Sequence, residues 1–389
     1  MRLLVAPDSF GGALDSVAVA DAIARGWSKV RAGDVITRRP MADGGEGTLA
    51  AIRAALGDAA VVRTTSVPDP LGRQVDADWL LLDGGRSAFI ELAAASGLAL
   101  LTVAERTPEN AARASTRGTG ELIRAALDAG VQRVTLGLGG SATTDGGSGL
   151  LSALGVRFLD RSGQPLPDGG GELTSLERVD TSGLDPRLAS TALVVASDVT
   201  NTLVGSAGAA ATYGPQKGAD AATVARLDGA LRHYGQQIEK ATGRLVADLP
   251  GSGAAGGTTA GLMGFVRAVL RPGFEVIAEL VDLPAALEEA ELVITGEGRA
   301  DEQTLRGKAA MGVATLARPR NTPVILLCGS LGAGAEALDV VQAISVVQPI
   351  IDRPLTLEEA MARTESLLLA AAGRAARSVG IGLDLASHR

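Results

Sequence analysis

The sequence has few of the residues on which several common kinds of enzyme chemistry depend. It contains one cysteine and two histidines in 389 residues. A single cysteine excludes a disulfide within the chain. His233 lies in a polar helical stretch and His388 is the penultimate residue, which argues against Ser-His-Asp or Cys-His catalysis and against most zinc sites. The chemistry must then rest on carboxylates, lysine or arginine, hydroxyls, backbone N–H groups and hard cations bound through oxygen.

Aromatic residues, basic runs and long hydrophobic runs are also scarce. Aromatics make up 2% of the chain and the formal net charge is −8, which argues against a nucleic-acid partner. The first apolar run ends at Pro7, too short for a signal peptide, and no run approaches the ~18 residues of a membrane span. Cys328 lies in an apolar run and is expected to be buried. We expect a soluble, cytoplasmic protein without membrane or nucleic-acid partners.

What is present is an alternation of short Val-, Ile- and Leu-rich runs with helical patterns, which is typical of parallel sheets in an α/β protein. The length favours two domains. Hairpin signals appear only in the middle of the chain, from the turn at 69–74 to residues 82–85. We therefore predict a discontinuous Rossmann-like domain over 1–68 and 288–389, with a mixed α/β domain inserted over 69–287.

Acidic, hydroxyl and glycine residues recur where predicted strands end. The segment Pro40-Met-Ala-Asp-Gly-Gly-Glu-Gly-Thr48 places Asp43 and Glu46 between glycines just before an amphipathic helix. Glycine lets the backbone turn and a ligand approach, and the helix directs N–H groups at an anion. Such a pattern predicts a cleft for a phosphorylated, metal-bearing ligand.

A second glycine-rich segment follows the predicted strand 133–137. No Gly-x-x-x-x-Gly-Lys-Ser/Thr motif occurs, so a P-loop is disfavoured. The segment still suits phosphate binding through Gly139, Gly140, Ser141 and Thr143, although a turn that caps the next helix explains it as well. Lys217 could neutralise phosphate or be an ordinary surface lysine.

Other strand ends supply further candidates, each with a structural alternative. Asp198 and Asn201 follow a predicted strand and could bind Mg²⁺ or a polyol, or close an Asx turn. The acids that follow the predicted strand 291–295 could line a site for a metal and a phosphate, or could stabilise the dipole of the next helix at its N-terminus. Arg73 could clamp a carboxylate. The remaining candidates on these strand ends are Asp8, Ser9, Gly296, Glu297, Asp301 and Gln303.

Seven segments in one order together resemble the bacterial glycerate kinases, over essentially the whole chain. They are Pro7-Asp-Ser-Phe10, residues 40–48, Asp69-Pro-Leu-Gly72, Gly139-Gly-Ser-Ala-Thr-Thr-Asp-Gly-Gly147, Gly214-Pro-Gln-Lys-Gly-Ala219, Pro250-Gly-Ser-Gly-Ala-Ala-Gly-Gly257 and Ile294-Thr-Gly-Glu-Gly-Arg299. The resemblance implies ATP, Mg²⁺ and D-glycerate, with 2-phosphoglycerate the usual product and 3-phosphoglycerate the other outcome. The family usually has lysine where this chain has Gly11.

We therefore expect an ATP-dependent glycerate kinase that works by positioning and charge neutralisation. The expected roles are catalysis for Asp198, Asp43 and Asn201; substrate binding for Asp8, Ser9, Arg73, Glu46 and Gln303; cofactor binding for Gly139, Gly140, Ser141, Thr143, Lys217 and Gly296; and metal binding for Glu297 and Asp301. Two alternatives stay open, a GHMP-type small-molecule kinase and a non-catalytic ligand-binding protein. The sequence leaves open the hydroxyl, the nucleotide preference, and the oligomeric state, a homo-oligomer included.

Overall fold

The computed structural model describes residues 1–302, 304, 309–335, 338 and 343–388. The chain folds into two compact units. The first unit comprises Met1–Ala42, Ala50–Gly57 and Phe274–Arg389, and the second comprises Asp43–Leu49 and Asp58–Gly273. Each unit has its own sheet and is described by itself.

Within its described residues, the first unit is built on a five-stranded parallel sheet in the order β13-β12-β11-β1-β2. Its strands are β1 Arg2–Val5, β2 Val35–Arg38, β11 Leu292–Ala300, β12 Val324–Leu331 and β13 Val346–Pro349. Its helices are α1 Ser16–Ser28, α11 Leu283–Glu289, α12 Ala309–Ala317, α13 Leu357–Ala362 and α14 Thr364–Ser387, together with most of α2 Thr48–Leu56 and α10 Gly273–Leu280.

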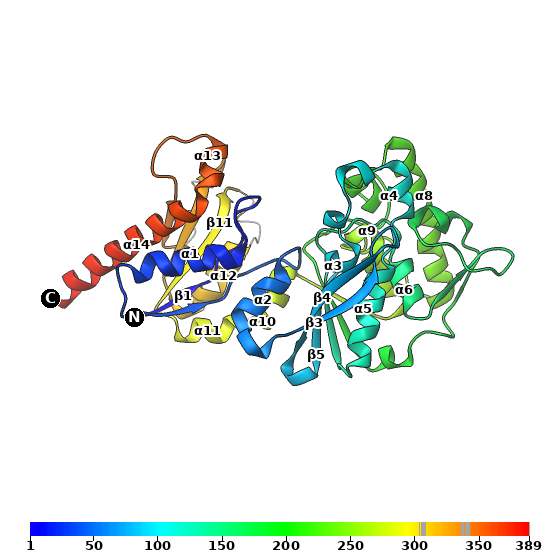
Figure 1. Cartoon of the computed structure of the whole chain (residues 1–389), viewed down its shortest axis with the longest axis horizontal. Coiled ribbons are helices and arrows are strands. Elements are labelled where there is room, and N and C mark those ends of the chain that lie inside the picture. Colours follow the sequence, from blue (N-terminus) through cyan, green and yellow to red (C-terminus); the bar gives the residue numbers. More distant parts are fainter. Residues whose placement is uncertain (303, 305–308, 336–337, 339–342, 389) are drawn as a thin grey trace. The chain divides into compact units, whose positions relative to one another are not determined.

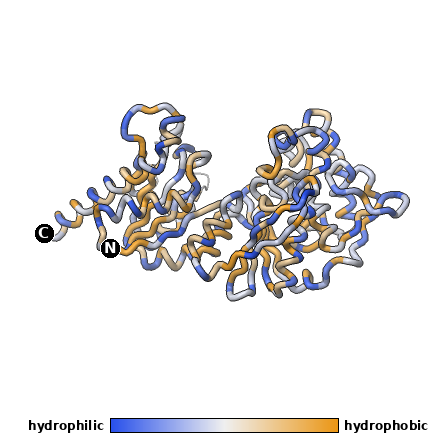
Figure 2. Tube along the Cα trace, in the orientation of Figure 1, coloured by the Kyte–Doolittle hydropathy of each residue, from blue (hydrophilic) through white to orange (hydrophobic). Residues whose placement is uncertain are grey.

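The core of the first unit explains why its inner strands are continuous apolar runs. Leu3, Val5 and Ile294 from β1 and β11 pack with Trp27 of α1 and Leu368 of α14 in one buried cluster. Figure 1 shows α1 and α14 running side by side, and Figure 2 shows hydrophobic residues gathered along the central strands. Leu4 and Val293 lie between the residues of this cluster and are also buried, so helices cover both faces of the sheet.

The second unit has a mixed sheet that contains, in the described chain, six strands in the order β10-β9-β6-β5-β4-β3. Its strands are β3 Val61–Pro68, β4 Gln74–Leu82, β5 Ser87–Glu91, β6 Arg133–Gly137, β9 Ala192–Ala196 and β10 Val269–Arg271, with β7 Arg157–Leu159 and β8 Arg178–Asp180 forming a separate ribbon. Its helices are α3 Ala93–Ser96, α4 Pro108–Arg113, α5 Arg117–Asp128, α6 Ser148–Ala153, α7 Ala209–Tyr213, α8 Ala221–Thr242 and α9 Ala254–Phe265.

The predicted α/β fold, with a parallel sheet and a mixed sheet, is confirmed, and the expected hairpin pairs β4 with β5. The residues around the predicted domain boundaries are distributed differently from the expectation. β3 pairs antiparallel with β4 along its whole length and belongs to the second unit, as do residues 43–49. Residues 274–287 belong to the first unit. Among the described residues, no helix has both the length and the hydrophobicity needed to span a membrane.

Candidate functional site

In the second unit, the glycine-rich segment that begins at Asp43 lies against the carboxyl ends of two neighbouring parallel strands, β6 and β9. The Gly139 N–H donates to the Gly44 carbonyl oxygen at 3.2 Å. A Cβ atom on Gly139 would lie 2.3 Å from the Cα of Gly45, and one on Gly44 would lie 2.9 Å from the Ala196 carbonyl oxygen. Glycine is required here because the backbones approach too closely for any side chain.

The Asp43 backbone and the Asp198 carboxylate both lie against Gly273 at this edge. The Gly273 N–H donates to Asp198 Oδ1 at 2.8 Å. A Cβ on Gly273 would lie 1.9 Å from the Asp43 carbonyl oxygen and 3.1 Å from Asp198 Oδ2. The Asp43 carboxylate accepts the N–H of Gly45 at 2.9 Å. Both aspartates are exposed at the surface of the unit and both have a carboxylate oriented by a backbone amide. We call Asp43, Asp198 and Gly273 the carboxylate cluster.

The N-terminus of α2 already has an anion from the protein itself. Glu91, which ends β5, is buried and accepts the N–H of Leu49 at 2.5 Å. Burial raises the pKa of Glu91, while hydrogen bonds from the amides of Leu49, Gly47 and Thr48 oppose that rise. In this structure these N–H groups are taken by Glu91, and their contact with a ligand stays a prediction. Glu46 is exposed, and its Cβ lies 4.0 Å from where a Cβ on Gly140 would be.

Lys217 holds the glycine-rich segment after β6 from inside the protein. Its side chain is 2% exposed, and Nζ donates to the Thr143 carbonyl oxygen at 2.6 Å and to Ser141 Oγ at 3.0 Å. Burial lowers the pKa of Lys217 to about 7, and the negative charge of Asp145 opposes this shift. The Thr143 side chain is fully buried. The geometry therefore fits a lysine that fixes the loop 139–147.

Asp145 organises the same loop from its other side. Its carboxylate accepts hydrogen bonds from the N–H and hydroxyl of Thr116 at 2.9 and 2.8 Å, and from the N–H groups of Gly147 and Gly149 at 3.1 and 3.2 Å. Burial raises the pKa of Asp145 and these donors oppose the rise. Asp145 thus accepts an N–H from the first turn of α6, whose N-cap residue is Gly147 rather than Asp145.

Two further residues of the second unit use their side chains within their own loops. Arg73 pairs with Asp69 at 2.6 Å and with Glu105, and donates to the Leu100 carbonyl oxygen at 3.2 Å. Asn201 donates to the Ala207 carbonyl oxygen at 2.7 Å and accepts from the hydroxyl of Tyr213 at 2.9 Å. Both side chains therefore hold loops together in this structure.

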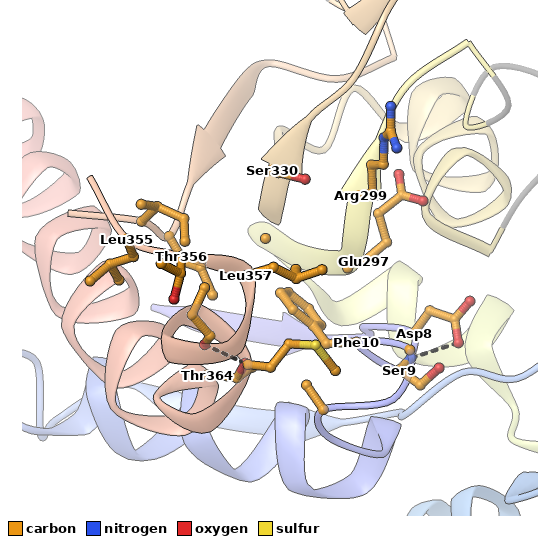
Figure 3. A pocket seen from close by; sticks show the side chains of 18 of the residues that line it. Asp8, Ser9, Phe10, Glu297, Arg299, Ser330, Leu355, Thr356, Leu357 and Thr364 are labelled. Atoms are coloured by element: carbon orange, nitrogen blue, oxygen red, sulfur yellow. Dashed lines mark hydrogen bonds between the residues drawn. The ribbon is translucent and has the colours of Figure 1, made fainter. Parts of the chain in front are cut away.

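In the first unit, a cavity of about 800 Å³ opens at the carboxyl ends of the parallel strands. Figure 3 shows Asp8, Glu297 and Arg299 on one side of it and Leu355 and Leu357 on the other. Ser9 lines the cavity as well, and its N–H donates to Asp8 Oδ1 at 2.6 Å. Gly296 lies in β11, and its carbonyl oxygen accepts the N–H of Asp8 at 2.8 Å.

The acids expected to bind metal also lie in the first unit, at the end of β11. Glu297 is buried beside Cys328, and burial together with that negative charge raises the pKa of the thiol to about 12. Asp301 Oδ2 lies 3.4 Å from Arg299 Nε. Gln303 lies outside the described residues. Within the part of the chain that the structure describes, no group of three His, Cys, Asp or Glu side chains is arranged to hold a metal ion.

Comparison with known proteins decides the family. A sequence model of the glycerate kinase family matches residues 3–380. The chain belongs to this family.

Several of its relatives are glycerate kinases of similar length. The chain is 45% identical over 380 residues to a glycerate kinase of Halalkalibacterium halodurans, covering 97% of both chains. It is 42% identical over 385 residues to the glycerate 2-kinase of Escherichia coli, covering 98% of this chain and 99% of the other. A crystal structure described as that of a glycerate kinase 2 from Salmonella typhimurium matches with a TM-score of 0.87 and 42% identity over 99% of both chains.

Family membership makes this glycerate kinase homologue a phosphotransferase and implies that it uses ATP. It confirms the resemblance of the seven sequence segments, since the match extends over almost the whole chain. Neither a GHMP-type kinase nor a non-catalytic protein is favoured by these relatives.

Sequence reasoning missed several residues that the geometry brings to the two strand edges. Glu91 could have been found from the sequence, because a carboxylate at the end of a buried apolar strand needs hydrogen-bond donors. Gly273 could not have been found, since a glycine after a strand is typical of any turn. Arg271 was missed too, although it ends β10 in register with Ala196, two residues before Asp198. The cavity wall from Leu355 to Met361 reads in the sequence as an ordinary amphipathic helix.

Proposed function

We propose that this protein transfers the γ-phosphoryl group of ATP to the 2-hydroxyl of D-glycerate, and that the carboxylate cluster of the second unit carries the reaction. The observation that supports this most strongly is the contact of Gly273 with both the Asp43 backbone and the Asp198 carboxylate. Two acids from distant segments stand at the carboxyl edge of a largely parallel sheet, beside a loop rich in backbone donors. The Escherichia coli relative, named glycerate 2-kinase, supports the choice of hydroxyl.

Asp198 is our candidate for the general base. As the glycerate oxygen forms its bond to the γ-phosphorus, the bond from that phosphorus to the bridging oxygen of ADP breaks and the hydroxyl proton passes to the carboxylate. The Gly273 N–H, from a different element, fixes Oδ1 of Asp198 at 2.8 Å. The Asp43 carboxylate is held by its own loop through Gly45. We therefore assign the proton to Asp198 and charge or metal binding to Asp43.

The substrate carboxylate needs a cation or amide donors. Arg73 is a weaker candidate than expected, because Asp69, Glu105 and Leu100 already take its guanidinium. We propose Arg271 as a second candidate on position alone, since its backbone register with Ala196 puts it at the end of the strand next to Asp198. An arginine suits a carboxylate through two parallel N–H donors. Arg271→Gln should raise the KM for glycerate and leave the KM for ATP unchanged; a glycerate KM that does not move would refute this role.

For the phosphates, the N–H groups of Gly140 and Ser141 are the proposed donors. Their neighbours are occupied, because Gly139 donates to Gly44 and Ala142 donates to the Ser96 carbonyl oxygen at 2.9 Å. Lys217 contributes by holding Ser141 and Thr143 in place rather than by reaching a ligand. Glu46 is exposed and lies close to Gly140, so it borders the proposed phosphate site.

Mg²⁺ fits the second unit better than the first. Magnesium in kinases takes most of its ligands from phosphates and water, so one or two carboxylates suffice. Asp43 offers hard oxygens of this kind, whereas Asp301 lies 3.4 Å from the Arg299 guanidinium. When bound, the ion would neutralise charge on the transferring phosphate. The role of Glu297 and Asp301 as metal ligands stays an untested prediction.

One experiment tests the proposed function. The purified chain is incubated with ATP, Mg²⁺ and D-glycerate, ADP release is followed by a coupled assay, and phosphorus NMR identifies the product. We expect 2-phosphoglycerate, formed in proportion to ADP. Formation of 3-phosphoglycerate would overturn the choice of hydroxyl, and an absence of glycerate-dependent ADP release would overturn the function.

A further inference from the structure

We propose that the cavity of the first unit binds the adenosine part of ATP, an inference that takes the nucleotide from the proposed function. The first support is topological. Along the sheet order β13-β12-β11-β1-β2, the chain runs from β1 to β2 in one direction and from β11 to β12 and β13 in the other. The order therefore reverses between β1 and β11, and in open parallel sheets the crevice at such a point is where ligands bind.

The walls of the cavity supply the second support, because they leave apolar side chains uncovered. Leu357 is 78% exposed and Met361 is 36% exposed, and both line the cavity. Phe10 and Ile350 form the buried part of the same lining. A volume of about 800 Å³ is ample for a nucleoside. A flat, largely apolar ring placed here would cover Leu357 and Met361, whereas no small polar ligand would.

The apolar side chains are held in place by the local structure. Thr356 and Glu359 form a capping box at the start of α13, in which each side chain accepts the backbone N–H of the other. This fixes the helix that presents Leu357 and Met361. On the opposite side, Met361 Cε lies 3.3 Å from where a Cβ on Gly12 would be. The wall is therefore preorganised without a ligand.

The polar end of the cavity has the groups that a ribose requires. Asp8 and Ser9 follow β1 and line the cavity, and the Ser9 N–H already orients the Asp8 carboxylate at 2.6 Å. In dinucleotide-binding α/β folds, a carboxylate accepts a hydrogen bond from the ribose 2′-hydroxyl. Asp8 would take this part and Ser9 would add a hydroxyl.

Glycerate fits this cavity poorly. It is small and anionic, and would leave most of the apolar wall exposed to water. Around the polar end, Asp8 and Glu297 are acidic and Arg299 is the cation among the lining residues that the structure describes. An uncharged nucleoside avoids the repulsion that a carboxylate would meet there.

Calorimetric titration of the full chain with adenosine and with ADP tests the proposal. The variant Leu357→Asp replaces an exposed side chain and should fold normally. It should weaken adenosine and ADP binding by about tenfold, the loss expected from removing one well-covered leucine contact. Leu385→Asp, at a leucine of α14 that is 65% exposed and outside the cavity lining, is the matched control and should bind both ligands normally.

Equal nucleotide affinity in Leu357→Asp and in Leu385→Asp would overturn the inference. So would a selective rise in the glycerate KM of Leu357→Asp, because it would assign the cavity to the other substrate. These results are distinct from a failure of the proposed function. A wild-type chain that binds adenosine in a Leu357-dependent way but does not phosphorylate glycerate would refute that function and leave the cavity assignment standing.

Discussion

Both units place polar residues at the carboxyl edge of a sheet, yet the two edges are built in opposite ways. In the second unit the edge is closed: Gly139 and Gly45 touch through their backbones, and Lys217 and Asp145 are buried and hydrogen-bonded. In the first unit the edge opens into a cavity of about 800 Å³ with exposed Leu357 in its wall.

The difference separates two tasks of a kinase. Charge stabilisation requires donors and carboxylates that do not reorganise during the reaction, which a densely packed edge provides. Binding a large nucleoside requires volume and apolar surface, which the open edge provides. On this account, changes at the closed edge should affect kcat or stability, and changes at the open edge should affect nucleotide affinity.

The largest effect is expected at Asp198. Asp198→Asn should lower kcat about 10²- to 10⁴-fold through loss of the base. Its melting temperature should change little, because the amide oxygen can still accept from Gly273. Steady-state kinetics with saturating ATP and glycerate provide the measurement. The control is Asp76→Asn on β4, an exposed aspartate in a strand away from the cluster. Turnover near that of the control would make Asp198 a structural residue.

The second-largest effect is expected from a change in packing at the closed edge of the second unit. Gly139→Ala forces a Cβ to within 2.3 Å of the Gly45 Cα, so the free energy of unfolding should fall by about 1–3 kcal/mol. Gly229→Ala is the matched control, because it lies within α8 and its Cβ would meet nothing within 4 Å. That variant should gain up to about 1 kcal/mol. If urea unfolding showed equal stability for the two variants, the edge would be looser than described.

A smaller effect is expected in the pH dependence of stability. Burial holds the pKa of Lys217 at about 7 in the folded chain, below its ordinary value of 10.5. Between these values the unfolded chain binds more protons, so the free energy of unfolding should rise with pH. Below pH 7 the cost of burying the charged Lys217 lowers the free energy of unfolding in full, and this cost is relieved as the pH rises toward 10.5. From pH 7 to pH 9 the wild type should gain on the order of 1 kcal/mol or more over Lys217→Met. Parallel curves for the two proteins would contradict a buried, titrating lysine.

The smallest effect is expected at Gly11, on the open edge. A Cβ at this position meets nothing within 4 Å, so Gly11→Lys should fit without strain. Because the carboxylate cluster lies in the other unit, kcat should change less than about tenfold, and any larger effect should fall on the KM for ATP, since Gly11 lines the cavity. Gly12 is the contrast: its φ is +75° and Met361 Cε would lie 3.3 Å from an added Cβ, so Gly12→Lys should be the more damaging change. Strong rescue of an inactive wild type by Gly11→Lys would contradict this.

Much of the fold could be predicted because buried parallel strands are short apolar runs bounded by glycine and proline. Strand β6 runs from Arg133 to Gly137 as predicted. Tertiary structure decided the rest. The helical pattern near the C-terminus is divided at Arg363 into α13 and α14, and α9 ends at Phe265 and is followed by β10. At its start, Ala255, Gly256 and Gly257 have positive φ.

The candidate site could also be predicted only in part from the sequence. Asp43 and Asp198 could be predicted as acids at strand ends, but they follow strands of different sheets, β2 and β9, so their common contact with Gly273 could not be predicted. The partners of Arg73, Asn201 and Lys217 could not, since a sequence does not show which carbonyl or carboxylate a long side chain will meet. Gly273 joins Asp43 to Asp198 through its backbone alone, and backbone contacts leave little trace in a single sequence.

Hydrogen exchange with each ligand separately tests the division of tasks most directly. Adenosine and D-glycerate are added in turn to the intact protein, and amide exchange is followed by mass spectrometry. The account predicts that adenosine protects residues 8–14 and 350–364 of the first unit, and that glycerate protects residues 43–47 and 196–201 of the second. Protection of residues 43–47 and 196–201 by adenosine, or of residues 350–364 by glycerate, would contradict it.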